Sequence, residues 1–254
     1  MKTSVLGTFA VSVLLATVVS ACGGTSEPKS AGSTPAAPAG TATAVATTAT
    51  PTPTPTPTAK AYTAGELAAI VGQVRDAADR RLSVLPSADI ATTLEQTKAL
   101  LASIDVKPAE CKDLAAASTV PSVDGAAMAV GMSTDAATGA VTALSLVSGL
   151  DQSFLTRLKG QQDQLAKCSS MTMTASGMEV AVTVTALEGV GSRPGTIAYR
   201  TDTALPNGQK QSTVTAQVVQ QGVVLTSVAS GGASEADAVQ RAGALLESAG
   251  ALVK

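Results

Sequence analysis

Few residues of this sequence carry reactive chemistry: it has three cysteines, Cys22, Cys111 and Cys168, and no histidine. Without histidine, a Ser–His–Asp triad, an imidazole general base and a histidine-ligated zinc water are ruled out. A thiol can be acylated, oxidised to a disulfide, act in a redox pair or bind a metal. The segment that contains each cysteine decides among these chemistries.

The first cysteine ends an N-terminal apolar segment. Lys2 supplies a positive charge, and 15 uncharged residues run from Val5 to Val19. A helix that spans a bilayer needs about 18–20 apolar residues. The segment is therefore short for a permanent anchor and is typical of a secretory signal peptide.

The end of this segment, Val19-Ser20-Ala21-Cys22, resembles the lipobox of bacterial lipoprotein precursors, in which a small residue precedes the modified cysteine. The resemblance implies that the Cys22 thiol receives a diacylglyceryl group and that a lipoprotein signal peptidase cleaves before Cys22. Residues 1–21 would then be the signal peptide, and Cys22 would carry fatty acyl chains such as palmitate, because two or three chains anchor a protein firmly. The alternative is an ordinary signal peptide with a chance cysteine.

The composition changes abruptly after Cys22. Residues 23–60 are rich in Gly, Ser, Thr, Ala and Pro, and Thr and Pro alternate strictly over residues 50–58. Such a segment buries too little apolar surface to offset its ordering entropy. We therefore expect residues 22–60 to form a disordered Pro/Thr-rich tether between membrane and domain. Threonine beside proline also suits O-glycosylation, although a plain spacer explains the composition equally well.

Residues 61–254 predict a single α+β domain. Thr63 and Glu66 form the capping box of a helix that apolar spacing extends through Leu82. Further helices are expected at 90–104, 111–117, 151–168 and 234–253, and strands at 128–132, 141–147, 171–173, 180–185, 197–203, 212–220 and 223–229. Hairpin-linked strands with helices grouped around them predict a twisted, largely antiparallel sheet of about six strands, covered by helices on one face.

No motif of the domain predicts catalysis. Residues 189–195, Gly-Val-Gly-Ser-Arg-Pro-Gly, look superficially like a phosphate-binding loop. Their spacing differs from GxGxxG, and Pro194 would break the helix that should follow, so we expect a strand connection. Residues 26–29 match SxxK but lie in the expected tether, where no site is preorganised. We expect no catalytic residue, no cofactor and no metal site.

The remaining cysteines, Cys111 and Cys168, form an even pair in a domain that we expect to be exported. In an oxidising compartment a disulfide between them is the expected state. Closing a loop of about 60 residues stabilises a fold by about 4 kcal/mol in the loop-entropy description. A redox pair and a metal site are the alternatives, but the spacing is not CxxC, and a site would lack a histidine or third thiolate.

Three short segments resemble a known family: Val106-Lys107-Pro108-Ala109-Glu110-Cys111, Ala166-Lys167-Cys168 and Met171-Thr172-Met173. They resemble the extracytoplasmic sensor-type domain of actinobacterial lipoproteins, which is similar to the external domain of a mycobacterial serine/threonine kinase. The resemblance implies a twisted antiparallel sheet with helices. This sequence lacks the kinase domain, the common Trp and Tyr positions and the second disulfide of that receptor.

Together these observations predict a lipoprotein on the extracytoplasmic side of the cell membrane. Its domain would bind or sense an envelope ligand or partner, such as a cell-wall or lipid molecule, without catalysis. A net charge of −2 gives no basic footprint for nucleic acid, and 2% aromatic residues disfavour sugar-stacking platforms. One alternative is a carrier of lipid or glycolipid in an aliphatic cavity, and another is an enzyme that acts through Ser–Lys or carboxylates.

Overall fold

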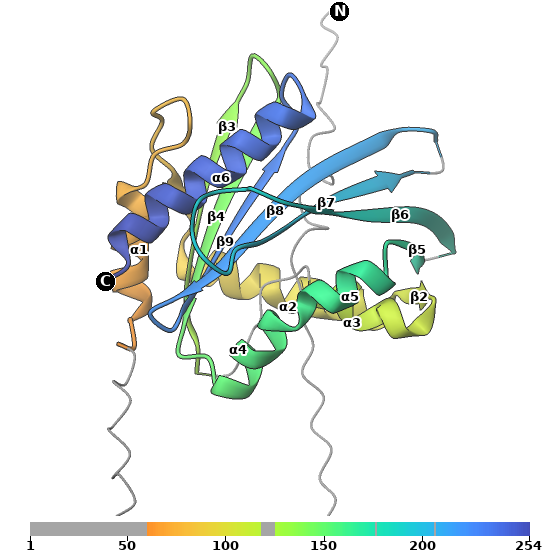
Figure 1. Ribbon diagram of the computed structural model, residues 1–254, viewed down its shortest axis with the longest axis horizontal. Coiled ribbons are helices and arrows are strands. Elements are labelled where there is room, and N and C mark those ends of the chain that lie inside the picture. Colours follow the sequence, from red (N-terminus) through yellow and green to blue (C-terminus); the bar gives the residue numbers. More distant parts are fainter. Residues whose placement is uncertain (1–59, 118–124, 176, 206) are drawn as a thin grey trace, which may run out of the picture. The chain divides into compact units, whose positions relative to one another are not determined.

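The computed structural model describes residues 60–117, 125–175, 177–205 and 207–254, and these ranges hold one α+β unit (Figure 1). The predicted signal peptide, Cys22 and the predicted tether up to residue 59 lie outside the described residues.

The order of helices and strands follows the predicted one, with additions. The helices are α1 (Ala64–Gln73), α2 (Ser87–Ser103), α3 (Lys112–Ala117), α4 (Gln152–Lys159), α5 (Gln161–Lys167) and α6 (Glu235–Leu252), and a 3₁₀ turn, η2 (Ala109–Cys111), precedes α3. The strands are β1 (Ser83–Val84), β2 (Asp105–Lys107), β3 (Ala127–Asp135), β4 (Ala140–Ser148), β5 (Ser170–Ala175), β6 (Met178–Leu187), β7 (Ile197–Ala204), β8 (Lys210–Gln220) and β9 (Val223–Ser230).

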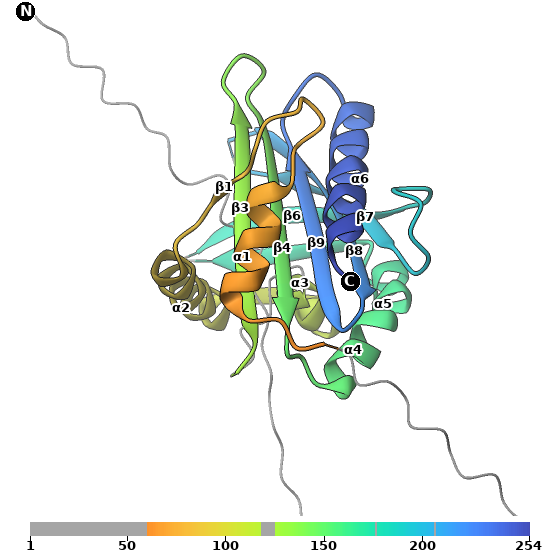
Figure 2. The ribbon, with the colours of Figure 1, turned by 90° about the vertical axis from the view of Figure 1, so that its left-hand side faces the viewer.

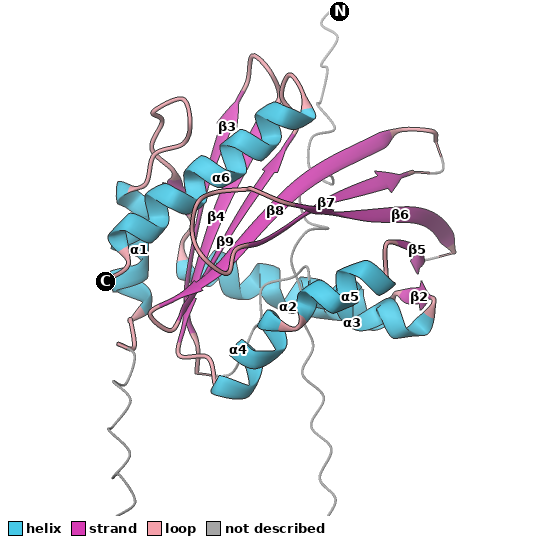
Figure 3. Cartoon of the chain, viewed as in Figure 1, coloured by secondary structure: helices cyan, strands magenta, loops and turns pink. Residues whose placement is uncertain are grey.

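The strands of the described ranges form one antiparallel sheet of nine strands, in the order β1-β3-β4-β9-β8-β7-β6-β5-β2 (Figure 3). The expectation of about six strands was therefore wrong. The two edge strands escaped prediction because β1 has two residues and β2 has three, and a period of two cannot be recognised over such lengths.

Helices cover both faces of this sheet, so the expectation of a single covered face was also wrong. In β4, Leu144 and Leu146 belong to a cluster with α1 and α6, whereas Val147 packs with Phe154 and Leu158 of α4. Neighbouring residues of a strand point to opposite faces. We call these the α1–α6 face and the α4–α5 face. Figure 2 shows α1 and α6 in front of the strands β4 and β9.

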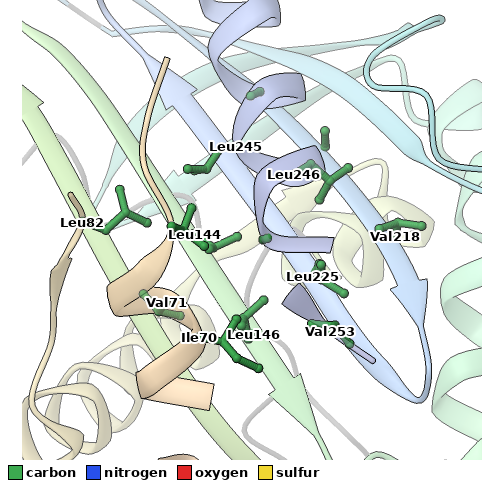
Figure 4. Close-up of a cluster of buried hydrophobic side chains, with 14 of the residues drawn as sticks. Ile70, Val71, Leu82, Leu144, Leu146, Val218, Leu225, Leu245, Leu246 and Val253 are labelled. Carbon is green, nitrogen blue, oxygen red and sulfur yellow. The ribbon is translucent and has the colours of Figure 1, made fainter. Parts of the chain in front are cut away.

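The largest hydrophobic cluster fills the α1–α6 face with aliphatic side chains (Figure 4). Its fully buried members include Val71 of α1, Leu225 of β9 and Leu245 of α6. Gly131 of β3 lies beneath α1, where an added Cβ would approach Val71 Cγ1 to 2.4 Å. The close approach of α1 to the sheet therefore requires glycine at this position.

The first helix is shorter than predicted and ends at Gln73 rather than near Leu82. Val74 is extended, and Asp76 folds the following segment into a loop by accepting 2.9 Å hydrogen bonds from the backbone N–H groups of Ala78 and Arg80. Leu82 still reaches the same core from extended chain. The apolar spacing therefore continued past the end of the helix.

Three predicted helix starts are confirmed, and one predicted helix is divided. Thr63 and Glu66 form the capping box of α1, Asp151 caps α4, and Ser234 caps α6. The helix predicted over 151–168 is divided at Gly160 into α4 and α5.

The chain enters the domain at Tyr62, which joins three distant segments. Its backbone N–H donates to Ser148 Oγ at the end of β4 (3.0 Å), and its hydroxyl accepts from the backbone N–H of Lys254 beyond α6 (2.9 Å). The hydroxyl also donates to the Lys254 carbonyl, and the Lys60 ammonium lies 4.2 Å from the ring centroid. Tyr62 therefore connects the start of α1 with β4 and with the end of α6.

Candidate functional site

The predicted disulfide between Cys111 and Cys168 is present, with a Cα–Cα distance of 5.6 Å. Cys111 ends η2 and Cys168 caps the C-terminus of α5, so the bond ties this end of α5 to the segment beside β2. Both cysteines are buried in an apolar cluster on the α4–α5 face, with Leu114, Leu165 and Met171 among its members. The third cysteine, Cys22, lies outside the described residues.

The Gly-rich motif at 189–195 lies in the loop between β6 and β7, which confirms the predicted strand connection. The loop rests against α6. Gly191 has a φ of +74°, which glycine adopts without strain, and a Cβ added to Gly243 of α6 would lie 3.1 Å from the Gly191 nitrogen. Glycine on both sides therefore allows the loop and the helix to touch.

This loop is paired with a carboxylate of the same chain, that of Glu247. Glu247 of α6 accepts hydrogen bonds from the backbone N–H of Ser192 and from the Ser192 hydroxyl (3.0 Å), while Arg193 Nε lies 3.2 Å from the other carboxylate oxygen. Burial raises the pKa of Glu247, but the hydrogen bonds from Ser192 and the charge of Arg193 outweigh it and hold the pKa below its ordinary value. Ser192 and Arg193 are thus already paired with a carboxylate of the same chain.

Arg193 extends this contact to the C-terminal end of α6. Its guanidinium donates to the Gln220 side chain (2.6 Å) and to the Glu247 carbonyl (3.1 Å). The Gln220 amide in turn donates to the carbonyls of Gly250 and Val253, each at 2.8 Å. Arg193 therefore connects the loop with β8 and α6.

A pocket of about 260 Å³ lies between this loop and α5. Gln162 of α5 lines one side, and residues 187–193, 195, 196 and 198 line the other. Three apolar side chains contribute to it, Leu187, Val190 and Ala198. The lining is largely polar, unlike the aliphatic cavity that the lipid-carrier alternative requires.

A second polar feature crosses the α4–α5 face of the sheet. Ser145, Thr226 and Gln217 are paired in register on β4, β9 and β8, and we call them the polar row. Gln217 Nε2 donates to Thr226 Oγ1 at 3.0 Å. The Ser145 hydroxyl is buried and has no hydrogen-bond partner in the described part of the chain.

Gln161, the first residue of α5, is a buried residue on the side of α5 that packs in the domain. It lies three positions after Leu158, whose cluster includes Val147 and Val224, and one turn before Leu165, whose cluster includes Ile197. In the register of the sheet, the polar row lies between these two contact areas and ends at Ile197. From this spacing we infer that the Gln161 side chain faces the polar row.

The Gln161 side chain is 3% exposed, and neither its amide nitrogen nor its amide oxygen has a hydrogen-bond partner among the described residues. A buried polar group left unpaired costs about 1–3 kcal/mol, and nearly all such groups in native proteins are paired. Gln162 and Thr196, the chain neighbours of Gln161 and Ile197, line the pocket, whereas Gln161 and the polar row do not. Pocket, polar row and Gln161 form the candidate site.

Sequence reasoning missed Ser145, Gln161 and Glu247. A signal for Gln161 was present, because a glutamine occupies an inward position between Leu158 and Leu165 of an amphipathic helix. Glu247 gave no signal, since its partner Ser192 is 55 positions away.

The described residues contain no group of three or more Cys, Asp or Glu side chains arranged to hold a metal ion. Within the same ranges, no helix combines the length and the apolar character needed to cross a membrane.

No protein-family model and no curated protein sequence matches the chain. Among solved structures, the chain is similar to the extracellular domain of PknH from Mycobacterium tuberculosis, with 15% identity and a TM-score of 0.46, over 75% of this chain and 97% of that one. It is also similar to an uncharacterized protein (Rv0999 ortholog) from Mycobacterium smegmatis, with 13% identity and a TM-score of 0.41, over 78% of this chain and 98% of that one. The first of these structures agrees with the resemblance to the external domain of a mycobacterial kinase that the short segments predicted.

Proposed function

We propose that this protein is an exported lipoprotein, anchored in the cell membrane through Cys22, whose α+β domain binds an envelope ligand without catalysis. The observation that carries the proposal is the pairing of Cys111 with Cys168. This bond leaves Cys22 as the one remaining cysteine of the sequence, directly after Val19-Ser20-Ala21.

The disulfide also supports an extracytoplasmic location. Disulfides persist in secreted and envelope proteins and are rare where thiol reductants are abundant. A bond that joins the two cysteines of the folded domain suits a protein that leaves the cytoplasm. Its lipid anchor would then retain it at the outer side of the membrane.

The polar groups at the pocket support binding rather than catalysis. The Ser192 hydroxyl donates to Glu247, and Arg193 is fixed by Glu247 and Gln220. A hydroxyl nucleophile needs an adjacent base that is itself oriented toward it. Ser192 and Arg193 line the pocket, but their hydroxyl and guanidinium groups are paired with Glu247 and Gln220 in a structural role.

Metabolic labelling with an alkyne fatty acid tests the anchor. Wild-type protein should carry the label and sediment with membranes, whereas Cys22→Ser should lose both properties. A matched control, Cys168→Ser, should keep the label, because it leaves the N-terminal segment intact. An unlabelled wild type, or an intact mass that corresponds to an uncleaved precursor with three free thiols, would overturn the proposal.

A further inference from the structure

We propose that Gln161 and the polar row bind a neutral polyhydroxy ligand, such as a sugar, through the hydrogen-bonding groups that the protein leaves unpaired. The inference rests on the proposed function, since it names the class of ligand that the domain takes. It starts from two side chains, Gln161 and Ser145, whose polar atoms are enclosed without partners among the described residues.

The unpaired groups define the chemistry of the ligand. The Gln161 carboxamide offers two donor hydrogens and an acceptor oxygen side by side, and the Ser145 hydroxyl offers one donor and two acceptor sites. Two neighbouring hydroxyls match a carboxamide, because one hydroxyl donates to Oε1 while the other accepts from Nε2. Thr226 adds a further hydroxyl in the same row.

The ligand should be uncharged. No member of the polar row carries a charge, and the inward positions of α4 and α5 are Phe154, Leu158, Gln161 and Leu165. Arg193, which lines the pocket, is paired with Glu247, and the other charged lining residue, Glu188, is exposed. A charged ligand enclosed between Gln161 and the polar row would lose its hydration without gaining a counter-ion from them, which is costly.

The polar row also explains how an aromatic-poor protein can hold a sugar. Stacking platforms need aromatic side chains, and these make up 2% of the sequence. Hydrogen bonds from amide and hydroxyl groups in an enclosed site provide recognition without stacking, and they discriminate strongly against molecules that lack the matching groups.

Access runs from the pocket beside Gln162 and Thr196. The Gln161 amide is enclosed in the ligand-free structure, so binding requires α5 to shift away from the sheet. The disulfide at Cys168 holds the C-terminal end of α5, and Gly160 divides α5 from α4 at the other end. The movable part is therefore the N-terminal turn of α5, which carries Gln161.

The test uses the full chain with Cys22→Ser, so that acylation does not enter the result. Its melting temperature is measured with glucose, galactose, arabinose and myo-inositol, and with glucuronate and glucosamine as charged counterparts. We expect at least one neutral compound to raise the melting temperature saturably, and the charged counterparts to leave it unchanged.

Two variants separate a ligand site from a packing defect. Without sugar, Gln161→Leu should raise the melting temperature by about 2–4 °C, because it removes an unpaired buried amide, and it should abolish the response to sugar. Ser145→Ala should weaken the response. The matched control, Gln164→Leu on the exposed side of α5, should keep the wild-type response.

The proposal is wrong if none of the four neutral compounds shifts the wild-type melting temperature, which would mean that Gln161 pairs with an enclosed water only. It is also wrong if Gln161→Leu still responds to sugar, or if the charged compounds bind as well as the neutral ones. Fatty-acid labelling does not depend on Gln161. A labelled protein that ignores sugar overturns this inference alone, and an unlabelled protein that binds sugar overturns the anchor alone.

Discussion

The carboxylate of Asp76 accepts a 2.7 Å hydrogen bond from the hydroxyl of Ser133, although 57 positions separate the two residues. The same carboxylate accepts from the Arg80 guanidinium at 2.8 Å and from two backbone N–H groups of its own loop. Burial raises the pKa of Asp76, but these hydrogen bonds outweigh it and keep the pKa below its ordinary value. Asp76 thereby fixes the loop after α1 to the strand β3.

Asp76→Asn should destabilise the fold by about 2–3 kcal/mol, because an amide nitrogen would face N–H donors inside a buried network. Urea unfolding followed by circular dichroism measures the change. Asp79→Asn is the matched control, since the Asp79 side chain is 86% exposed, and it should change the free energy of unfolding by less than about 0.5 kcal/mol. Equal effects at the two positions would contradict this role for Asp76.

Glu247 should make the stability depend on pH. Its pKa is lowered in the folded state, so its contribution is present in full above the unfolded pKa, near 4.5, and is lost as the pH falls through the lower folded pKa. At pH 7, Glu247→Gln should therefore be less stable than wild type, and the difference should shrink as the pH falls below 4.5.

Unfolding of wild type and Glu247→Gln across pH 3–7 measures this difference. Glu188→Gln changes an exposed carboxylate of the same loop and should follow the wild-type pH profile. A wild-type/Glu247→Gln difference that stays constant over the range would show that the carboxylate charge is not what holds the loop.

Gly131→Ala should destabilise the protein by about 1–3 kcal/mol, since the new Cβ would press on Val71 and on Leu82, whose Cβ lies 3.0 Å away. Gly65→Ala supplies the contrast, because nothing lies within 4 Å of its added Cβ and alanine favours a helix over glycine. Thermal melts of the two variants should move in opposite directions. A neutral Gly131→Ala would mean that α1 can move away from the sheet without cost.

Removing the disulfide with the double variant Cys111→Ser/Cys168→Ser should cost about 4 kcal/mol in the loop-entropy description, given the 57 positions between the cysteines. Guanidinium unfolding measures the loss. The variant and the reduced wild type should share a midpoint, and Cys22→Ser should leave the midpoint of the oxidised protein unchanged. A reduced wild type as stable as the oxidised protein would contradict a structural role for the bond.

Local signals predicted much of this fold. The capping box of Thr63 and Glu66 and the caps at Asp151 and Ser234 depend on residues within one turn of the helix, so the sequence displays them directly. The hairpins are equally local, and the predicted strands 128–132 and 141–147 pair as parts of β3 and β4. These interactions need no knowledge of the rest of the chain.

The parts that escaped prediction depend on distant partners. Apolar spacing predicted that the first helix extends through Leu82. The helix instead ends at Gln73, and Asp76 holds the following loop and accepts a hydrogen bond from Ser133. The short strand β1 exists because Ser83 and Val84 meet Met132 and Gly131 of β3. Its two residues have no pattern of their own, and tertiary contact alone makes them a strand.

The candidate site divides in the same way. The pairing of Cys111 with Cys168 could be predicted, because the sequence predicts an exported domain with two cysteines besides Cys22. Gln161 and Ser145 could not be assigned together, since their proximity depends on how α5 lies across β4, β9 and β8. Sheet register, which only the folded chain displays, made the polar row visible.

The contacts of Tyr62 also set how the domain responds to mechanical load. A pull that reaches Lys60 from the N-terminal segment meets at once the hydrogen bonds of Tyr62 to Ser148 and to Lys254. The force is thereby shared between β4 and the end of α6, and α1 is not pulled away from the sheet alone. A pulling force on the domain would therefore act first on β4 and α6.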